Sequence, residues 1–207
     1  MLMKGTNEWK PESALTEGLF LVHYCHPRCK PFQNILRLPK EEAFALAEKL
    51  ARENPEDAAF GRFADFANYY PRRLETDAFL YENFLRLGGK PRERHPLSFV
   101  LQGSGYWENW FGNGPSYRIR LSEIPPDGVS FTLGDSCAQY ERTDAIRQLT
   151  LEQLLARMEG FPNVEAFLEE AAKPYSYIEA QLWDGAVIES RLYFEEWRGN
   201  GNECGND

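Results

Sequence analysis

The chain of 207 residues is 43% hydrophobic and 14% aromatic, which is enough apolar material for the core of one domain. Its net charge of -9 argues against broad nucleic-acid binding, because such binding needs a positive surface that displaces counterions. No apolar run approaches the length of a membrane span and no secretory signal opens the chain, so we expect a cytoplasmic protein without a membrane partner. The cysteines, Cys25, Cys29, Cys137 and Cys204, are too scattered for a disulfide framework, and we expect free thiols.

The two ends of the chain are predicted to be disordered, with residues 15–198 forming one domain between them. Residues 1–14 are polar and interrupted by proline, and residues 199–207 are rich in glycine and asparagine. The first element of the domain is a short apolar run over 18–25, which predicts a buried strand that ends before Pro27.

Three helices are expected after this strand. The first begins at Pro39, carries Ala43, Leu46, Ala47 and Leu50 at helical spacing, and ends at Asn54. Aromatic and alanine residues at the same spacing predict a second helix over 58–70, and phenylalanine and leucine residues predict a third over 76–87. The prediction ends the second helix before Pro71, because the residue before a proline is disfavoured in helical conformation.

The following part of the chain is predicted to be mainly strands and then helical again. Glycines and prolines separate short β-rich segments, and one helical insert follows the first of them. The strands are expected over 96–101, 117–121 and 129–133, the insert over 106–111, and two later helices over 150–158 and 163–172.

The penultimate strand, predicted over 175–183, carries a carboxylate where core packing does not require one. Its alternation places Ile178, Ala180 and Leu182 on one face and Glu179 among aromatic residues on the other. That second face is predicted to be exposed to solvent, with the floor of a cleft as the alternative. Residues 186–194 are expected to form a hairpin with this strand. The elements together predict an α+β fold, a single domain with a bent, mostly antiparallel sheet and helices segregated in sequence.

Three short motifs suggest chemistry but lack a required partner. The Gly134-Asp-Ser136 turn resembles that of GDS-type esterases, which place a histidine base later in the chain, and no histidine follows it here. The Gly103-Ser-Gly105 loop lacks the glycine that a nucleophile elbow has two residues before its serine. A zinc site is conceivable in the segment around Cys25, but it lacks the usual ligand-pair spacing, so we expect no metal; the four candidate ligands are His23, Cys25, His26 and Cys29.

The order of several segments resembles the layout of ADP-ribosyltransferases, and most closely the DNA-modifying ADP-ribosyltransferase toxins. In that family a first strand ends in His-x-Thr-His, a middle strand reads Phe-Thr/Ser-Asp-Gly, and a late strand carries a glutamate before aliphatic residues. The matching segments here are His23-Tyr-Cys-His26, His95-Pro-Leu-Ser-Phe99, Val129-Ser-Phe-Thr-Leu-Gly-Asp-Ser136 and Tyr177-Ile-Glu-Ala-Gln-Leu182. Cys25 stands where the family has a hydroxyl residue, and the family's substrate-positioning arginine has no clear counterpart.

The resemblance implies an enzyme that uses NAD as a substrate. Glu179 would stabilise the positive charge that develops on the ribose, and His23 would contact a ribose hydroxyl. Further contacts to the dinucleotide would come from Tyr177, Ser130, Thr132 and His95. On packing grounds alone, Ser130 and Thr132 are ordinary strand residues. The reading requires that His23 and Glu179 open into the same hollow.

A non-enzymatic alternative rests on the aromatic insert. Trp107, Trp110 and Phe111 are expected to pack this insert against the sheet, and if exposed they would form a surface for a protein partner in an interaction or regulatory domain. Positive charge also gathers over 72–94, either as a solvated face or as an anion site. Arg72 and Arg73 in particular could bind helix-terminal carbonyls, which we favour, or a phosphate or stacked base.

Overall fold

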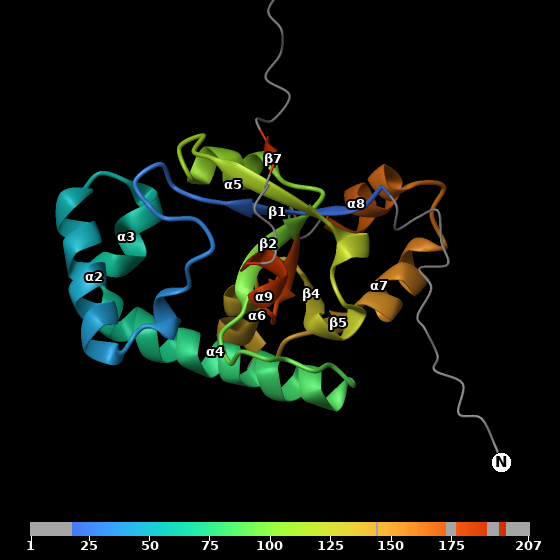
Figure 1. Cartoon of the computed structure of the whole chain (residues 1–207), viewed down its shortest axis with the longest axis horizontal. Helices are drawn as coiled ribbons and strands as arrows, with labels where there is room; N and C mark the ends of the chain where they lie inside the picture. Colours follow the sequence, from blue (N-terminus) through green and yellow to red (C-terminus); the bar gives the residue numbers. More distant parts are fainter. Residues whose placement is uncertain (1–17, 144, 173–176, 190–194, 198–207) are drawn as a thin grey trace, which may run out of the picture.

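The computed structural model describes residues 18–143, 145–172, 177–189 and 195–197, and this part of the chain is a single α+β domain (Figure 1). Its centre is a seven-stranded sheet in which neighbouring strands are antiparallel, so the predicted fold class is confirmed. The predicted disordered ends, 1–14 and 199–207, lie outside the described residues. The sheet order is β5-β4-β6-β2-β1-β3-β7, with bounds β1 Phe20–Tyr24, β2 Leu97–Leu101, β3 Ser116–Arg120, β4 Val129–Leu133, β5 Gln148–Thr150, β6 Ile178–Leu182 and β7 Glu195–Trp197.

Helices cover both faces of this sheet. Helices α4 and α6 lie against one face, α7 and α8 lie against the other, and α2 and α3 stand beside the sheet (Figure 1). Among the described residues, no helix combines the length and apolarity needed to span a bilayer. The helical bounds are η1 Ile35–Arg37, α2 Lys40–Glu53, α3 Ala58–Ala64, α4 Phe66–Arg86, α5 Gly105–Trp110, η2 Leu121–Glu123, η3 Pro126–Gly128, α6 Ser136–Thr143, α7 Leu151–Met158, α8 Val164–Ala172 and α9 Ala186–Glu189.

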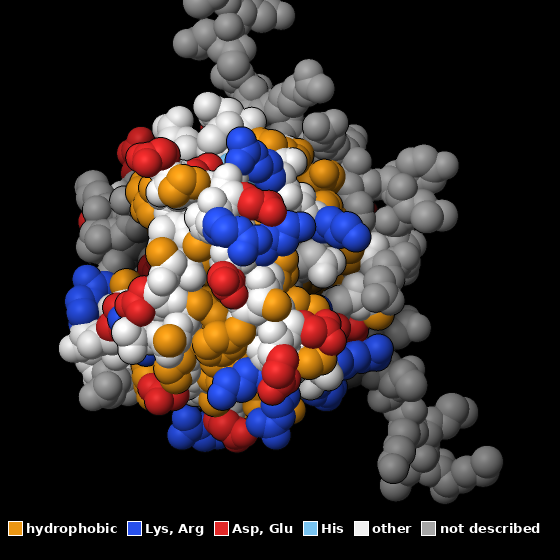
Figure 2. All heavy atoms as spheres, turned by 90° about the vertical axis from the view of Figure 1, so that its left-hand side faces the viewer, with side chains coloured by type: hydrophobic (Ala, Val, Ile, Leu, Met, Phe, Trp, Pro, Cys, Tyr) orange, Lys and Arg blue, Asp and Glu red, His pale blue; other side chains and the backbone are white. Residues whose placement is uncertain are grey.

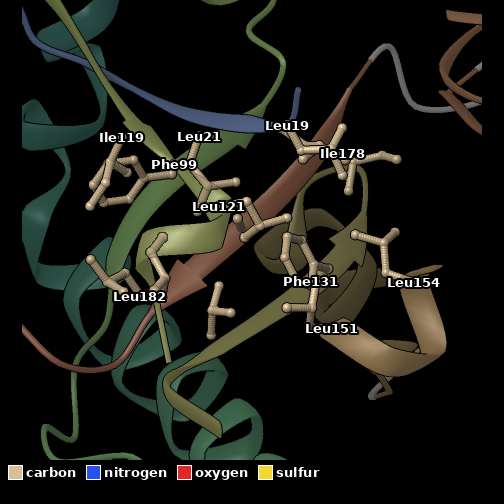
Figure 3. Close-up of a cluster of buried hydrophobic side chains, with 14 of the residues drawn as sticks. Leu19, Leu21, Phe99, Ile119, Leu121, Phe131, Leu151, Leu154, Ile178 and Leu182 are labelled. Atoms are coloured by element: carbon tan, nitrogen blue, oxygen red, sulfur yellow. The ribbon is translucent and has the colours of Figure 1, made fainter. Parts of the chain in front are cut away.

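The main apolar core fills the space between the sheet and α7 (Figure 3). Antiparallel register brings Phe99, Ala180 and Phe131 side by side across β2, β6 and β4, and Leu154 of α7 belongs to the same cluster. Each fully buried phenylalanine or leucine of this kind stabilises the fold by about 2 kcal/mol. A second cluster, in which Ala43 and Ala47 are buried, joins α2 to α4, whereas Leu46, expected inside, is 37% exposed.

The predicted boundary between the second and third helices is wrong. Helix α3 ends at Asp65, whose backbone angles (φ -116, ψ 45) leave the helical region, and α4 then continues through Pro71. A proline inside a helix deprives the carbonyl four residues earlier of its donor. Here that carbonyl belongs to Ala67, and both residues are exposed, so water can hydrate it. Because the helix is continuous, Arg73 lies one turn before Asp77 and donates a hydrogen bond to it. Arg72 donates from Nε to the Asn68 carbonyl.

The predicted hairpin after β6 is also wrong. Strand β6 has β2 on one side and β4 on the other, so neither of its edges is free for residues 186–194. Asp184 instead accepts a hydrogen bond from the amide of Ala186 and begins α9. Residues 190–194 lie outside the described part of the chain.

The alternation predicted for β6 is confirmed, but neither face of the strand is exposed to solvent. All five residues of Ile178–Leu182 are buried. The face that carries Glu179 is covered because Trp183 stacks on Phe84 of α4 and the start of α6 lies against Glu179. The expectation of a solvent-exposed face is therefore wrong, and this face needs internal partners for its polar groups.

Candidate functional site

The sheet places His23 and Glu179 on opposite faces. Strand β2 lies between their strands, and its Val100 pairs with both Val22 of β1 and Glu179 of β6. Residues opposite each other in antiparallel strands share a face, whereas successive residues alternate. Val22 and Glu179 therefore share one face, and His23 belongs to the other. The expected convergence of His23 and Glu179 is wrong.

His23 closes a gap between β1 and β2. The ladder between these strands ends at Val22, and beyond it the imidazole Nδ1 lies 3.0 Å from the carbonyl oxygen of Ser98. The amide of Phe32 donates to Nε2 at 2.9 Å, which fixes the neutral ring with its proton on Nδ1. Burial lowers the pKa of His23 to about 4, against a smaller opposing effect of the Ser98 carbonyl. Both ring nitrogens are occupied, so His23 is a structural bridge.

The same bridge holds an unusual backbone conformation in place. Phe32 has a φ of 55, in the left-handed region that a bulky residue rarely adopts. Its ring stacks on His23 at a centroid distance of 4.8 Å, in addition to the hydrogen bond from its amide. The two contacts determine the course of the loop that leads from β1 to η1.

Glu179 binds the N-terminus of α6. Its carboxylate Oε2 accepts a hydrogen bond from the amide of Ser136 at 2.8 Å and one from the Thr132 hydroxyl at 3.3 Å. Asp135 occupies the same helix end and accepts from the amide of Ala138 at 2.8 Å. Two carboxylates at one helix N-terminus fit the positive end of its dipole but repel each other.

The protonation of Glu179 reflects this crowding. Burial raises the pKa of Glu179 to about 6, and the nearby Asp135 charge acts in the same direction. Arg73 and the amide of Ser136 oppose the shift because they stabilise the ionised carboxylate. Glu179 is 9% exposed, so its environment is that of a buried capping group.

Ser130 and Thr132 belong to a buried ladder of side-chain hydrogen bonds. Ser130 donates to Gln181 at 2.9 Å and accepts from Trp183 and Gln148 at 2.9 and 2.8 Å. Gln181 in turn donates to Thr132 at 3.1 Å, and this hydroxyl reaches Glu179. Every one of these groups finds its partner inside the protein, so the hydroxyls predicted to hold a dinucleotide are already engaged.

His95 joins a second polar cluster on the same side of the sheet. Asp77 is fully buried in α4 and receives hydrogen bonds from Arg73 at 3.1 Å and His95 Nδ1 at 2.9 Å. Arg73 also donates to the sulfur of Cys137 at 3.0 Å. Burial raises the pKa of Cys137, which keeps the sulfur protonated near neutral pH. Sequence reasoning missed Asp77, although its spacing of four residues from Arg73 is the available signal.

The aromatic insert is anchored on the sheet, as predicted, and also presents one ring to solvent. In α5, Trp107 packs edge-on against Tyr177 at 5.3 Å, and Phe111 joins the same cluster over β1 and β2. Tyr106 lies parallel to Tyr177 at 6.3 Å yet remains 51% exposed. Tyr177 is 7% exposed, so it supports the insert and is covered by it.

A groove of about 750 Å³ opens beside this insert. It lies between the connection from α2 to α3 and the outer side of α5. One wall is aromatic, since Tyr106 stacks with Trp110 at 6.0 Å. The lining residues are Arg28, Glu53, Asn54, Pro55, Glu56, Asp57, Ala58, Tyr106, Asn109, Trp110 and Gly112. It is larger than a second hollow of about 380 Å³, which lies between α4 and Tyr140 of α6.

The segment considered for zinc instead supports one wall of the groove. The ring of His26 accepts the amide of Arg28 at Nδ1, so Nε2 carries the proton and donates to Asp57 at 2.8 Å. Asp57 also caps α3 through the amide of Ala59. Cys25 lies with its sulfur 3.2 Å from the Cys29 carbonyl. Within the described residues, no three His, Cys, Asp or Glu side chains are grouped as a metal site.

The positive charge over 72–94 is divided among separate partners. Arg72 pairs with Glu141, Lys90 with Asp127 and Arg92 with Asp184, at 2.9, 2.6 and 3.3 Å. Arg73 is bound to Asp77 and Arg94 lies over Tyr81. Arg86 donates to the side chain of Asn83 at 3.4 Å. The partners of these cations are therefore separate groups, and the cations do not gather around one anion site.

Comparison of the chain with protein-family models, curated proteins and solved structures finds no match.

Proposed function

We propose that the protein is a non-enzymatic interaction module that binds a peptide segment of a protein partner in the groove beside α5. The observation that carries the proposal is the position of Tyr106. Its ring is half exposed on a helix that Trp107 and Phe111 hold firmly to the sheet. Large aromatic side chains on rigid elements provide contact area at a small cost in conformational entropy, and they are enriched at protein interfaces.

The chemistry of the groove favours binding over catalysis. Among its described lining residues there is no serine, cysteine, lysine or histidine, so it offers no nucleophile paired with a histidine base. Its volume lies in the range of ordinary binding pockets. ADP-ribosyl transfer from NAD has less support, because Glu179 is buried in a capping role and His23 lies on the other side of the sheet.

Selection of random displayed peptides on the purified full chain tests this proposal. Peptides that bind in the groove are expected to lose about tenfold or more in affinity on Tyr106→Ala, because a central aromatic residue often dominates an interface. The matched control is Leu85→Ala, since Leu85 is also a large apolar residue, 43% exposed, but lies on α4. Circular dichroism establishes that both variants are folded.

The pattern of losses decides the outcome. Peptides whose affinity depends on Tyr106 and not on Leu85 support the groove as the binding site. If no selected peptide depends on Tyr106, or if both substitutions weaken binding equally, the proposal is refuted. A rise in melting temperature with NAD that Glu179→Gln abolishes would instead favour a dinucleotide site, since a ligand that binds only the folded form must stabilise it.

A further inference from the structure

The part of the chain beside the groove differs in charge from the rest of the protein. Residues 26–64, here called the α2–α3 lobe, contain seven Lys or Arg and six Asp or Glu, a net charge of +1. The whole chain carries -9, so the remainder carries -10. A surface that is locally less acidic than its surroundings stands out in the field of the protein.

Six of the seven cations of this lobe form no ion pair with any described residue. One of them, Lys40, begins α2 at the end of the helix away from the groove, which leaves the other five. They contrast with Arg72, Lys90 and Arg92, which are all paired. Lys and Arg side chains run across the upper part of the face that carries α2 and α3, above a group of hydrophobic side chains (Figure 2). We call the five residues the basic band; they are Arg28, Lys30, Lys49, Arg52 and Arg62.

The basic band continues into the groove through Arg28. This residue lines the groove, and its guanidinium donates to the side chain of Asn54 and, at 3.4 Å, to the carbonyl of Glu53 at the end of α2. Both acceptors are neutral groups, so the positive charge of Arg28 is not cancelled. Lys49 and Arg52, three residues apart on α2, lie on the same side of that helix.

We propose that the groove and the basic band together bind an acidic protein segment that carries one large apolar side chain. The inference rests on the proposed function and adds the chemistry of the partner. The apolar side chain enters the groove against Tyr106 and Trp110, and flanking carboxylates meet the basic band. Arginine and lysine both attract carboxylates, and arginine can bind them through two parallel hydrogen bonds.

The acidic residues of the groove define the orientation of this segment. Glu53 and Glu56 are exposed, and neither forms an ion pair with a described residue, so they repel carboxylates from their side of the groove. Asp57 is occupied by His26 and by its cap on α3. A short acidic peptide fits better than nucleic acid, because a long polyanion would also meet the acidic remainder of the protein.

NMR titration with three capped pentapeptides tests the inference. Each peptide has a central tryptophan, flanked by glutamates, by glutamines or by lysines, and tryptophan indole signals of the protein report binding. The glutamate peptide is expected to bind about tenfold more tightly than the glutamine peptide, from two to three exposed charge pairs. Its affinity falls as salt rises from about 0.05 to 0.3 M, because screening weakens exposed pairs.

Two double variants with the same loss of charge locate the contact. Lys49→Gln with Arg52→Gln is expected to weaken the glutamate peptide about tenfold. Arg142→Gln with Arg147→Gln removes two exposed cations outside the lobe and is expected to change affinity by less than about twofold. Equal losses in the two double variants would show that only net charge matters, which overturns the basic band as the site.

The outcomes separate this inference from the proposed function. Glutamine or lysine peptides that bind as well as the glutamate peptide, with dependence on Tyr106, overturn the acidic preference but leave the groove as a binding site. Absence of any binding dependent on Tyr106 removes both proposals. Binding of single-stranded oligothymidylate through the basic band, without binding of the glutamate peptide, overturns the acidic peptide in favour of nucleic acid.

Discussion

Replacement of His23 by glutamine is expected to remove a large part of the acid sensitivity of folding. The ring is neutral in the folded protein, with a pKa of about 4, whereas the same ring in the unfolded chain has a pKa of 6.5. As pH falls below about 6.5, His23 takes up a proton in the unfolded chain, whereas in the folded protein it stays neutral down to about pH 4. The stability contributed by His23 is therefore present above this window and is lost as pH falls through it.

The magnitude follows from the size of the pKa shift. A difference of about 2.5 pKa units corresponds to about 3 kcal/mol of unfolding free energy. The cause is structural, because a proton on Nε2 would face the amide hydrogen of Phe32 in a buried site. At about pH 7 the glutamine variant loses part of the bridge to Ser98 and Phe32, at a cost of about 1–3 kcal/mol.

Urea denaturation at a series of pH values between about 4 and 7 measures both effects. The wild type is expected to lose more stability across this range than His23→Gln, and the difference between the two slopes isolates the histidine. If the glutamine variant keeps the full acid slope of the wild type, the buried neutral histidine is not its source. The same conclusion follows if the urea midpoints of the two proteins, measured by fluorescence, differ by the same amount at every pH.

Three further substitutions probe the other face of the sheet. Glu179→Gln has the opposite pH dependence, because the raised pKa of Glu179 makes wild-type stability fall as pH rises from about 4.5 to 6. The variant is expected to be about 2 kcal/mol more stable at pH 7 in urea denaturation, and an unchanged pH profile would contradict this. Asp77→Asn is expected to cost about 3 kcal/mol in thermal denaturation, because it leaves the charge of Arg73 uncompensated; a loss below about 1 kcal/mol would disprove a buried pair. Ser130→Ala is expected to cost about 2 kcal/mol, since the indole of Trp183 loses its acceptor; near-neutral stability would mean that water replaces the hydroxyl.

The local elements are well encoded in the sequence, and the prediction of α2 shows why. Pro39 begins this helix, acidic residues fill its first turn, and Asn54 ends it, all through interactions within a few residues. Pro71 gives the same kind of signal but misled the prediction. Whether a helix tolerates a proline depends on the solvent exposure of the freed carbonyl, which only the tertiary structure determines.

The candidate site was less predictable, because it depends on strand order and register. Alternation correctly placed Glu179 on the face opposite Ala180. It did not reveal that β2 separates β6 from β1, or that Val22 and not His23 shares the face of Glu179. A shift of one residue in either pairing reverses the relation between the two faces, and no local pattern specifies that parity.

The central position of β6 has a consequence for folding during synthesis on the ribosome. Strands β4 and β2 are not paired with each other, and the sheet connects them only through β6. In β6, Glu179 pairs with Thr132 on one side and with Val100 on the other. The two halves of the sheet therefore cannot join until this late segment has emerged from the exit tunnel. Until then the nascent chain exposes two unpaired strand edges. Such edges are prone to aggregation, and chaperones bind nascent chains during this period.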